Sequence, residues 1–392
     1  MTGRRTLAAL GVAAVLVAVG GCSTEPSAPA TEPATGAPAA PAWEQVAPGP
    51  LTPRVDASVA WLGDRFLVAG GRAERPCPPN ADCAFDPDAV LTDAATYDPV
   101  TRTWAAAAPL PVPLFGAQTA LVDGALYLLG TPAEQGAPVF LAYEPDDDAW
   151  RTLPAPATPG RLATDSHVLV EAGGSDEQGP ADDEIFDPAT STWSALPDDP
   201  IGSSFDRQIS VVAGSLVLSA KDLVDSPGGE DGPAFVRLAS FDLGSGAWTT
   251  LPDSEILGWD PLVASGRMVW PDPGGADGGQ VDPYDREYPY GGIYDPVDGT
   301  WYGLPAELEP RPGVTWPRLS TGSLVTSVGL LLDPVSMGTW VLPDAPWDVG
   351  DAPTFGASPQ YLLTWGGDAD LEPLGWVLRL DDVHGELGAV GD

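Results

Sequence analysis

Four arginines are the side chains best placed in this sequence to hold an anionic ligand. Arg54, Arg161, Arg207 and Arg318 each follow a tryptophan that recurs along the chain, in or near the start of a predicted strand. A guanidinium group binds carboxylates and phosphates through paired hydrogen bonds. These four residues are therefore the candidates for an anion-binding site at the mouth of a central channel. The alternative is that each one satisfies carbonyl groups and acids close to it.

A second candidate site is the segment from Asp272 to Gly292, which mixes acids, glycines and tyrosines. Its tyrosines can stack on a sugar ring or on a partner protein, and they are Tyr284, Tyr288 and Tyr290. Carboxylates among glycines can ligate calcium, and the weak candidates are Asp272, Asp277, Asp282 and Asp285. No EF-hand pattern is present, so we expect a solvated loop without a metal.

The two cysteines Cys77 and Cys83 stand close together in the sequence RPCPPNADC. In an exported protein such a pair is expected to form a disulfide that closes a small loop. A metal site would need further ligands, and no histidine lies in this loop.

The common catalytic motifs are absent from the sequence. It has no G-x-S-x-G motif, no phosphate-binding loop and no zinc-ligand spacing. His167 and His384 are its only histidines, and acidic pairs are so numerous that none stands out as an acid–base couple. His167 lies on a predicted strand, and we expect it to have a structural role. We expect no catalytic residue and no cofactor.

The formal charge of −39 repels nucleic-acid phosphates and anionic lipid headgroups, so nucleic-acid binding is excluded on this ground. Lys221 is the only lysine of the chain. The charge is explained by solubility outside the cell; the alternative is an acidic functional patch.

The candidate residues are positioned by a repeat that recurs about every 40–50 residues, a period typical of repeat folds. Its most regular part is an octet, YDPVTRTW, which begins at Tyr97 and recurs in variant form at Tyr143, Phe186, Phe241 and Tyr294. A sixth, more divergent copy reads LDPVSMGTW. The Asp-Pro pair predicts a type I turn, and the tryptophan is expected to pack against the neighbouring unit.

Each period predicts four short antiparallel strands. Two apolar runs flank a polar turn, as in AQTALVDGALYLLG; a third strand leads into the octet, and a fourth carries the tryptophan. Repeated units of this kind form the blades of a β-propeller. We predict an all-β, seven-bladed β-propeller over residues 43–383, with six or eight blades as alternatives. The Trp43 strand has no octet of its own and is expected to close the ring.

Three marks recur in order within these units. They are the Tyr-Asp-Pro, the tryptophan seven residues after the aromatic, and paired glycines closing a second strand at Gly70-Gly71, Gly173-Gly174 and Gly366-Gly367. In these marks the chain resembles the Kelch-repeat family, including the propeller of galactose-oxidase-like proteins. The copper site of galactose oxidase implies two histidine ligands, tyrosines and a cysteine cross-linked to a tyrosine. His384 begins the predicted C-terminal tail (384–392) and both cysteines share one loop, so we predict no oxidase activity.

Residues 1–21 are typical of an export signal. Arg4 and Arg5 precede an apolar run that is shorter than a typical membrane-spanning helix. Small residues then lead into Cys22, and this junction resembles a bacterial lipobox, which implies cleavage before Cys22 and its lipidation. An ordinary secretory signal is the alternative, and both the Sec and the twin-arginine routes stay open. Residues 22–42 contain no large apolar side chain and are expected to form a disordered Ala/Pro/Thr tether.

Long insertions fall between the second and third predicted strands of their blades, at residues 72–92, 175–183, 221–234 and 271–291. In a propeller these connections emerge on one face, and binding residues usually lie on such loops. The sequence therefore predicts an exported, lipid-anchored scaffold on the outer side of a cell membrane that binds a protein or a glycan without catalysis. The alternative is an enzyme that acts on an extracellular saccharide from the central pocket.

Overall fold

The repeated octet folds into a turn that its aspartate stabilises. In the first copy, the Asp98 carboxylate accepts hydrogen bonds from the backbone N–H groups of Val100 and Thr101, at 2.8 and 3.1 Å. The hydroxyl of Thr101 also donates to this carboxylate, and these bonds lower the pKa of Asp98 below its usual range. Asp187 and Asp333 accept the same kinds of bonds in their own copies. A turn at the predicted position is confirmed.

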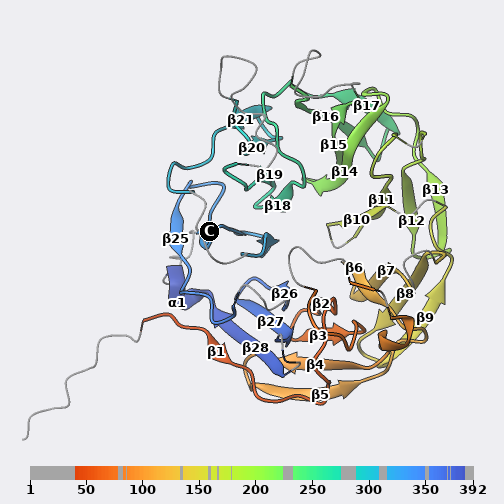
Figure 1. Ribbon diagram of the computed structural model, residues 1–392. Coiled ribbons are helices and arrows are strands. Elements are labelled where there is room, and N and C mark those ends of the chain that lie inside the picture. The colour runs from red at the N-terminus through yellow and green to blue at the C-terminus, as the bar shows by residue number, and fades with distance from the viewer. Residues whose placement is uncertain are drawn as a thin grey trace, which may run out of the picture. The chain divides into compact units, whose positions relative to one another are not determined.

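Each such turn joins the third and fourth strands of a four-stranded antiparallel sheet, and the described part of the chain contains seven of these sheets. They follow one another as blades in a ring (Figure 1). Their first strands contact one another around the centre of the ring. The predicted seven-bladed β-propeller is confirmed.

The strands of blades 1 to 4, from the innermost to the outermost, are β2 (Ser58–Trp61), β3 (Phe66–Ala69), β4 (Ala94–Asp98) and β5 (Thr103–Ala107); β6 (Phe115–Val122), β7 (Ala125–Thr131), β8 (Val139–Glu144) and β9 (Ala149–Leu153); β10 (Arg161–Thr164), β11 (Leu169–Ala172), β12 (Glu184–Asp187) and β13 (Thr192–Ala195); β14 (Ser204–Val212), β15 (Ser215–Asp222), β16 (Val236–Asp242) and β17 (Ala247–Thr250). The strands of blades 5 to 7 are β18 (Leu262–Ala264), β19 (Arg267–Trp270), β20 (Gly292–Asp295) and β21 (Thr300–Tyr302); β22 (Leu319–Ser320), β23 (Val325–Ser327), β24 (Leu330–Leu332) and β25 (Thr339–Val341); β26 (Thr354–Ala357), β27 (Tyr361–Gly367), β28 (Pro373–Arg379) and β1 (Glu44–Gln45).

The ring is closed by the strand that directly follows Trp43, as predicted. In blade 7, β1 pairs antiparallel with β28, so that Glu44 stands opposite Val377 and Gln45 opposite Trp376. The first and last strands of the described residues thus share one blade, and the edge that β28 would otherwise expose is paired.

This computed structural model describes residues 40–77, 83–84, 86–132, 136–157, 160–165, 167–177, 179–223, 233–274, 288–308, 316–348, 353–368, 370 and 372–384. The predicted signal peptide (1–21), Cys22, most of the tether (22–42) and most of the C-terminal tail lie outside these residues. Two short helices accompany the strands, η1 (Pro87–Ala89) and α1 (Asp381–His384). Within the described ranges, no helix combines the length and the hydropathy that a membrane span requires.

The octet tryptophans join neighbouring blades. The indole N–H of Trp193, on the outermost strand of blade 3, donates to the carbonyl of Pro154 in blade 2 at 3.0 Å. Its ring lies 5.0 Å from Phe186 in its own blade and 5.2 Å from Phe140 in blade 2. Among the described residues the buried apolar side chains form seven clusters, one at each interface between adjacent blades. The expected packing of tryptophan across blades is confirmed.

The long insertions leave the ring on one side. They connect the second and third strands of blades 1, 3, 4 and 5, although β15 extends through Asp222 and therefore includes the first two residues of the predicted 221–234 insertion. We call the side that carries these connections, and those between successive blades, the loop face. The opposite side carries the octet turns, and we call it the turn face.

Candidate functional site

Arg54 is buried inside blade 1 and is closed to a ligand. Its side chain is 0% exposed. The guanidinium makes paired hydrogen bonds to the Asp93 carboxylate, at 2.6 and 2.8 Å, and also donates to the carbonyl oxygens of Gly70 and Thr52. Arg54 therefore follows the alternative stated for the four arginines: it satisfies groups close to it.

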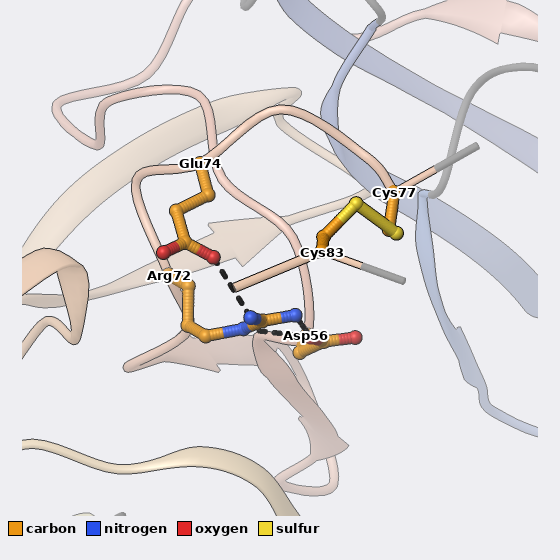
Figure 2. Close-up of a disulfide and its surroundings, with 5 residues drawn as sticks. All are labelled: Asp56, Arg72, Glu74, Cys77 and Cys83. Carbon is orange, nitrogen blue, oxygen red and sulfur yellow. Dashed lines mark hydrogen bonds and ion pairs between the residues drawn. A yellow bond between two sulfur atoms is a disulfide. The ribbon is translucent and has the colours of Figure 1, made fainter. Parts of the chain in front are cut away.

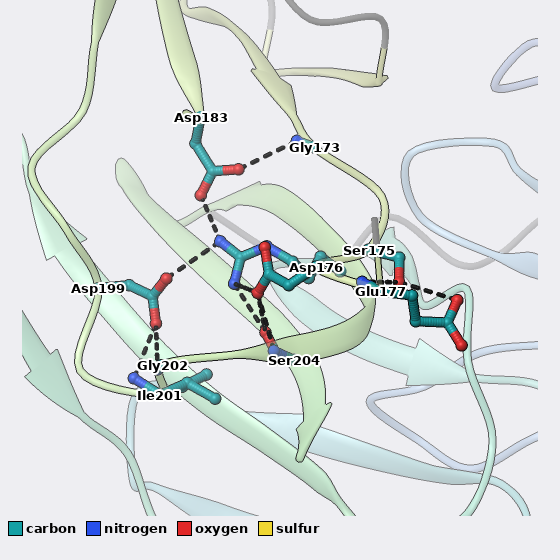
Figure 3. A network of polar contacts seen from close by, with 10 residues as sticks. Gly173, Ser175, Asp176, Glu177, Asp183, Asp199, Ile201, Gly202 and Ser204 are labelled. Atoms are coloured by element: carbon teal, nitrogen blue, oxygen red, sulfur yellow. Dashed lines mark hydrogen bonds and ion pairs between the residues drawn. The ribbon is translucent and has the colours of Figure 1, made fainter. Parts of the chain in front are cut away.

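Arg207 is likewise buried, and it joins blade 4 to blade 3. Figure 3 shows the three aspartates that surround it, Asp176, Asp183 and Asp199. From β14 its guanidinium contacts Asp183 at 2.7 Å and Asp199 at 3.0 Å, with Asp176 at 3.7 Å. Asp176 and Asp183 belong to the connection between β11 and β12. Asp183 also accepts a hydrogen bond from the Gly173 N–H at 3.1 Å. These carboxylates hold Arg207 in a structural role between the two blades.

Arg161 and Arg318 converge on one carboxylate at the loop face. Arg161 begins β10 in blade 3, and Arg318 directly precedes β22 in blade 6. Both form ion pairs with Asp260 of blade 5, which Arg318 contacts at 3.0 Å. Arg318 also contacts Asp272 at 2.8 Å. Burial lowers the pKa of Arg161, and the charge of Arg318 lowers it further.

Asp260 is one of three aspartates with left-handed backbone at the start of an innermost strand. Asp56, Asp206 and Asp260 have φ angles of 54°, 51° and 57°, a conformation that aspartate tolerates better than most residues. Arg72 pairs with Asp56 at 2.5 Å, and Lys221 pairs with Asp206 at 3.1 Å. The cations that pair with Asp260 do not come from blade 5 itself. They are Arg161 of blade 3 and Arg318 of blade 6.

A cavity of about 120 Å³ lies among these groups, lined by Arg161, Gly174, Asp206, Arg207, Gln208, Trp259 and Asp260. Two of its buried polar atoms, Arg207 Nε and Gln208 Oε1, have no hydrogen-bond partner. Lys221 stacks over the Trp259 ring at 5.4 Å. We call Arg161, Asp206, Trp259, Asp260 and Arg318, with this cavity, the entrance site, because they lie where the innermost strands begin.

Arg161 occupies a position that other blades give to glutamine. Arg161 pairs with Ala172 in the register of blade 3, as Gln118 pairs with Leu129 in blade 2. The Gln118 side chain bonds to the backbone of the following blade, donating to the Gly160 carbonyl at 2.6 Å. Arg161 instead reaches Asp260, two blades further on, and its side chain remains 49% exposed. Of the four predicted arginines, only Arg161 and Arg318 come together.

The predicted tyrosines do not form a common surface. Tyr290 is buried and packs edge-on against Trp259 at 5.8 Å, while Tyr288 packs against Phe235 at 5.0 Å. Tyr284 lies outside the described residues, as do the calcium candidates Asp277, Asp282 and Asp285. Asp272 pairs with Arg318, and no group of three or more potential metal ligands occurs within the described ranges.

Cys77 and Cys83 form a disulfide in the long connection of blade 1, with the sulfur atoms 2.12 Å apart (Figure 2). Beside it, Arg72 contacts Glu74 at 2.8 Å as well as Asp56. The Arg72–Asp56 ion pair ties the connection to the start of β2, whereas the disulfide closes a small loop within the connection.

Both histidines take positions that differ from the prediction. His167 lies in the turn between β10 and β11 rather than on a strand, because Leu169 is the first residue of β11. Its Nδ1 is 2.9 Å from Asp123 in blade 2, and this hydrogen bond raises the pKa of His167. His384 ends α1 and packs against Trp340 at 5.8 Å, so the folded part includes this residue of the predicted tail.

Sequence reasoning missed one further residue, Glu171, whose side chain is fully buried without a hydrogen-bond partner. It stands two positions after Leu169, which pairs with the octet aromatic of its blade. The corresponding residues of blades 1, 2 and 4 are all apolar: Val68, Leu128 and Leu218. Burial raises the pKa of Glu171 to about 8, with Asp183 and Glu184 adding to the effect.

Known relatives of this chain carry Kelch repeats. It is 26% identical over 204 residues to a Kelch-like protein, terF, of Aspergillus terreus, which is 51% of this chain and 34% of that protein. It is 29% identical over 177 residues to the human Kelch repeat and BTB domain-containing protein 13, which is 43% of this chain and 35% of that protein. An F-box/kelch-repeat protein of Arabidopsis thaliana matches 28% of this chain at 29% identity.

These matches span about a third of the length of each relative. No family profile matches the chain. The relatives and the seven four-stranded blades together support a Kelch-repeat propeller.

Proposed function

We propose that this protein is a non-catalytic scaffold that binds a partner protein across its loop face, with the entrance site at the centre of the contact. The observation that carries this proposal is the convergence of Arg161, Asp260 and Arg318 from three blades on the face that also bears the long insertions. Trp259 lies beside them. Arginine and tryptophan are enriched at protein interfaces and often dominate their energetics.

The comparisons support this proposal at a coarser level. Kelch-repeat propellers generally serve as protein-interaction scaffolds and are mostly not enzymes. A glycan is the alternative ligand, because the same mixture of guanidinium, carboxylate and indole groups can bind sugar hydroxyls and stack on a sugar ring.

We also propose that the chain is exported and anchored at the outer side of a membrane through a lipid on Cys22. The lipobox-like junction before Cys22 supports this proposal. The Cys77–Cys83 disulfide supports it as well, because such bonds persist in oxidising compartments.

The binding proposal is tested by photo-cross-linking in cells that produce the full chain. A p-benzoylphenylalanine in place of Trp259 keeps an aromatic group at the entrance site. The control position is Val297, which is 88% exposed on the turn face. We expect a protein cross-linked at position 259 and not at 297.

A second variant, Arg161→Gln, carries the residue that blades 2 and 4 hold at this position, and it should fold normally. Combined with the probe at position 259, it is expected to reduce the cross-link at least tenfold. Equal cross-linking at both positions, or none at 259, would contradict the proposed protein contact. A product at 259 that carries sugar but no second polypeptide would favour the glycan.

A further inference from the structure

A groove of about 550 Å³ lies on the loop face between blades 4 and 5, away from the entrance site. It is lined by the start of β16, by the connection that follows β17, by Pro289 of the β19–β20 connection, and by the end of β21. These residues are Phe235, Val236, Arg237, Asp253, Ser254, Glu255, Ile256, Pro289, Trp301, Tyr302 and Gly303. None of them lines the cavity of the entrance site. The volume is within the range of about 300–1,000 Å³ that ligand pockets occupy.

The outermost strand of blade 5 ends at the groove. Strand β21 stops at Tyr302 after three residues, whereas β5 and β9 each run for five. The next residue is Gly303, at which an added Cβ would meet no other atom within 4 Å. A side chain at this position would therefore extend into the groove instead of disturbing the fold.

The walls of the groove are apolar and aromatic. Phe235 forms one side and is supported by Tyr288, whose ring lies 5.0 Å away. Trp301 lines the other side, where its indole N–H donates to the Pro252 carbonyl at 3.2 Å and its ring lies 5.2 Å from that of Trp270. Both rings are thus held in place before any ligand arrives, which lowers the entropic cost of binding.

The charged groups at the groove are predominantly acidic. Arg237 is held between Asp222 at 2.9 Å and Asp253 at 3.1 Å, so its charge is already matched. The Asp253 side chain remains 77% exposed, and Glu255 is exposed next to it. Among the described residues, Asp222 and Asp253 both pair with Arg237, in a chain of net charge −39. An anionic ligand would be repelled, and a cation beside an apolar group would be complementary.

We propose that this groove binds a segment of a partner protein that presents a lysine or arginine side chain next to an aromatic or large aliphatic one. The apolar side chain packs between Phe235 and Trp301, and the cation lies against the exposed carboxylate of Asp253. This inference rests on the proposed scaffold function and extends it with a second contact of defined chemistry.

The test is panning of a random dodecapeptide phage library on the full chain in detergent, followed by affinity measurement of the enriched peptides. We expect enriched sequences that combine a basic with an aromatic or aliphatic residue. Gly303→Trp should weaken their binding at least tenfold by filling the groove. The matched control is Gly244→Trp on the turn face, where an added Cβ meets only ordinary contacts, and it should change affinity less than twofold.

Charge is tested with Asp253→Asn, which removes one exposed carboxylate and should weaken binding about three- to fivefold at low salt. Enriched peptides that are acidic, or that bind Gly303→Trp as well as they bind the unmodified chain, would overturn the inference. So would groove binding confined to oligosaccharides. If the chain binds the peptides but gives no cross-link at position 259, only the proposed contact at the entrance site is rejected. The two proposals can therefore fail independently of each other.

Discussion

Glu171 makes the stability of the propeller depend on pH. Its carboxyl is buried and keeps a proton up to about pH 8, whereas the unfolded chain releases that proton near the ordinary value of 4.5. The folded state thus binds more protons between these values, and each unit rise in pH lowers the free energy of unfolding by about 1.4 kcal/mol. This dependence of stability on pH is opposite to that of a carboxylate in an ion pair, which contributes more stability as the pH rises through its pKa.

Glu171→Leu supplies the residue type that blades 2 and 4 carry at this position. We expect the variant to be more stable than the unmodified protein, with the difference growing by roughly 3–4 kcal/mol from pH 5 to pH 8. Chemical denaturation at the two pH values measures this. The control is Glu177→Leu on the exposed β11–β12 connection, which should show no such growth. A difference that is constant with pH would show that Glu171 is ionised in the folded protein.

The arginines show which features of single residues can be predicted from the sequence. Because the chain contains few cations, arginine stood out in the sequence as the candidate residue type. Arg161 and Arg318 do contact the same carboxylate, that of Asp260. However, the sequence could not reveal that Arg54 and Arg207 point into their own ion pairs, because a shift of one position along a strand turns a side chain to the other face. Asp206 and Asp260 were missed among many acids, although an acid just before or within the first strand of several blades was the available signal.

At the scale of the blade, the octet provides most of the stabilising contacts that could be predicted from the sequence. Trp193→Ala removes a ring that packs on Phe140 of the neighbouring blade and a hydrogen bond to Pro154. We expect the free energy of unfolding to fall by about 3 kcal/mol, the lower end for a buried aromatic because the indole is partly exposed.

The measurement is thermal or chemical unfolding, with Val297→Ala as the control. Val297 stands at the exposed tip of an octet turn, and its truncation should change stability by less than about 0.5 kcal/mol. If Trp193→Ala unfolds like the unmodified protein, the tryptophan does not hold blade 3 to blade 2.

The blade count, the strand order and the face of the insertions could all be predicted, because each follows from a pattern that repeats. The groove between blades 4 and 5 could not. At this groove β21 ends two residues before its counterparts in blades 1 and 2, and the next residue is a glycine without a side chain. A feature that occurs in one blade only produces no periodic pattern in the sequence. Such features also allow the blades to differ in function.

At the scale of the whole molecule, the proposed anchor determines where the propeller works. Cys22→Ser removes the thiol that would carry the lipid, so the protein should move from the membrane pellet to the soluble fraction. Cell fractionation followed by immunoblotting measures this, and Cys77→Ser with Cys83→Ser serves as the control because it leaves Cys22 in place. Membrane association that survives Cys22→Ser would refute lipidation at this residue.

The pairing of β1 with β28 also bears on how the molecule is made. The strand at Glu44–Gln45 is synthesised before any other strand of the ring, and its partner at Pro373–Arg379 is synthesised last. Until then the growing chain is an open arc whose terminal strand edges can pair with another copy. A chain that stops short of Pro373 would keep those edges, and a premature stop late in the message should therefore yield an aggregating product rather than a slightly smaller propeller.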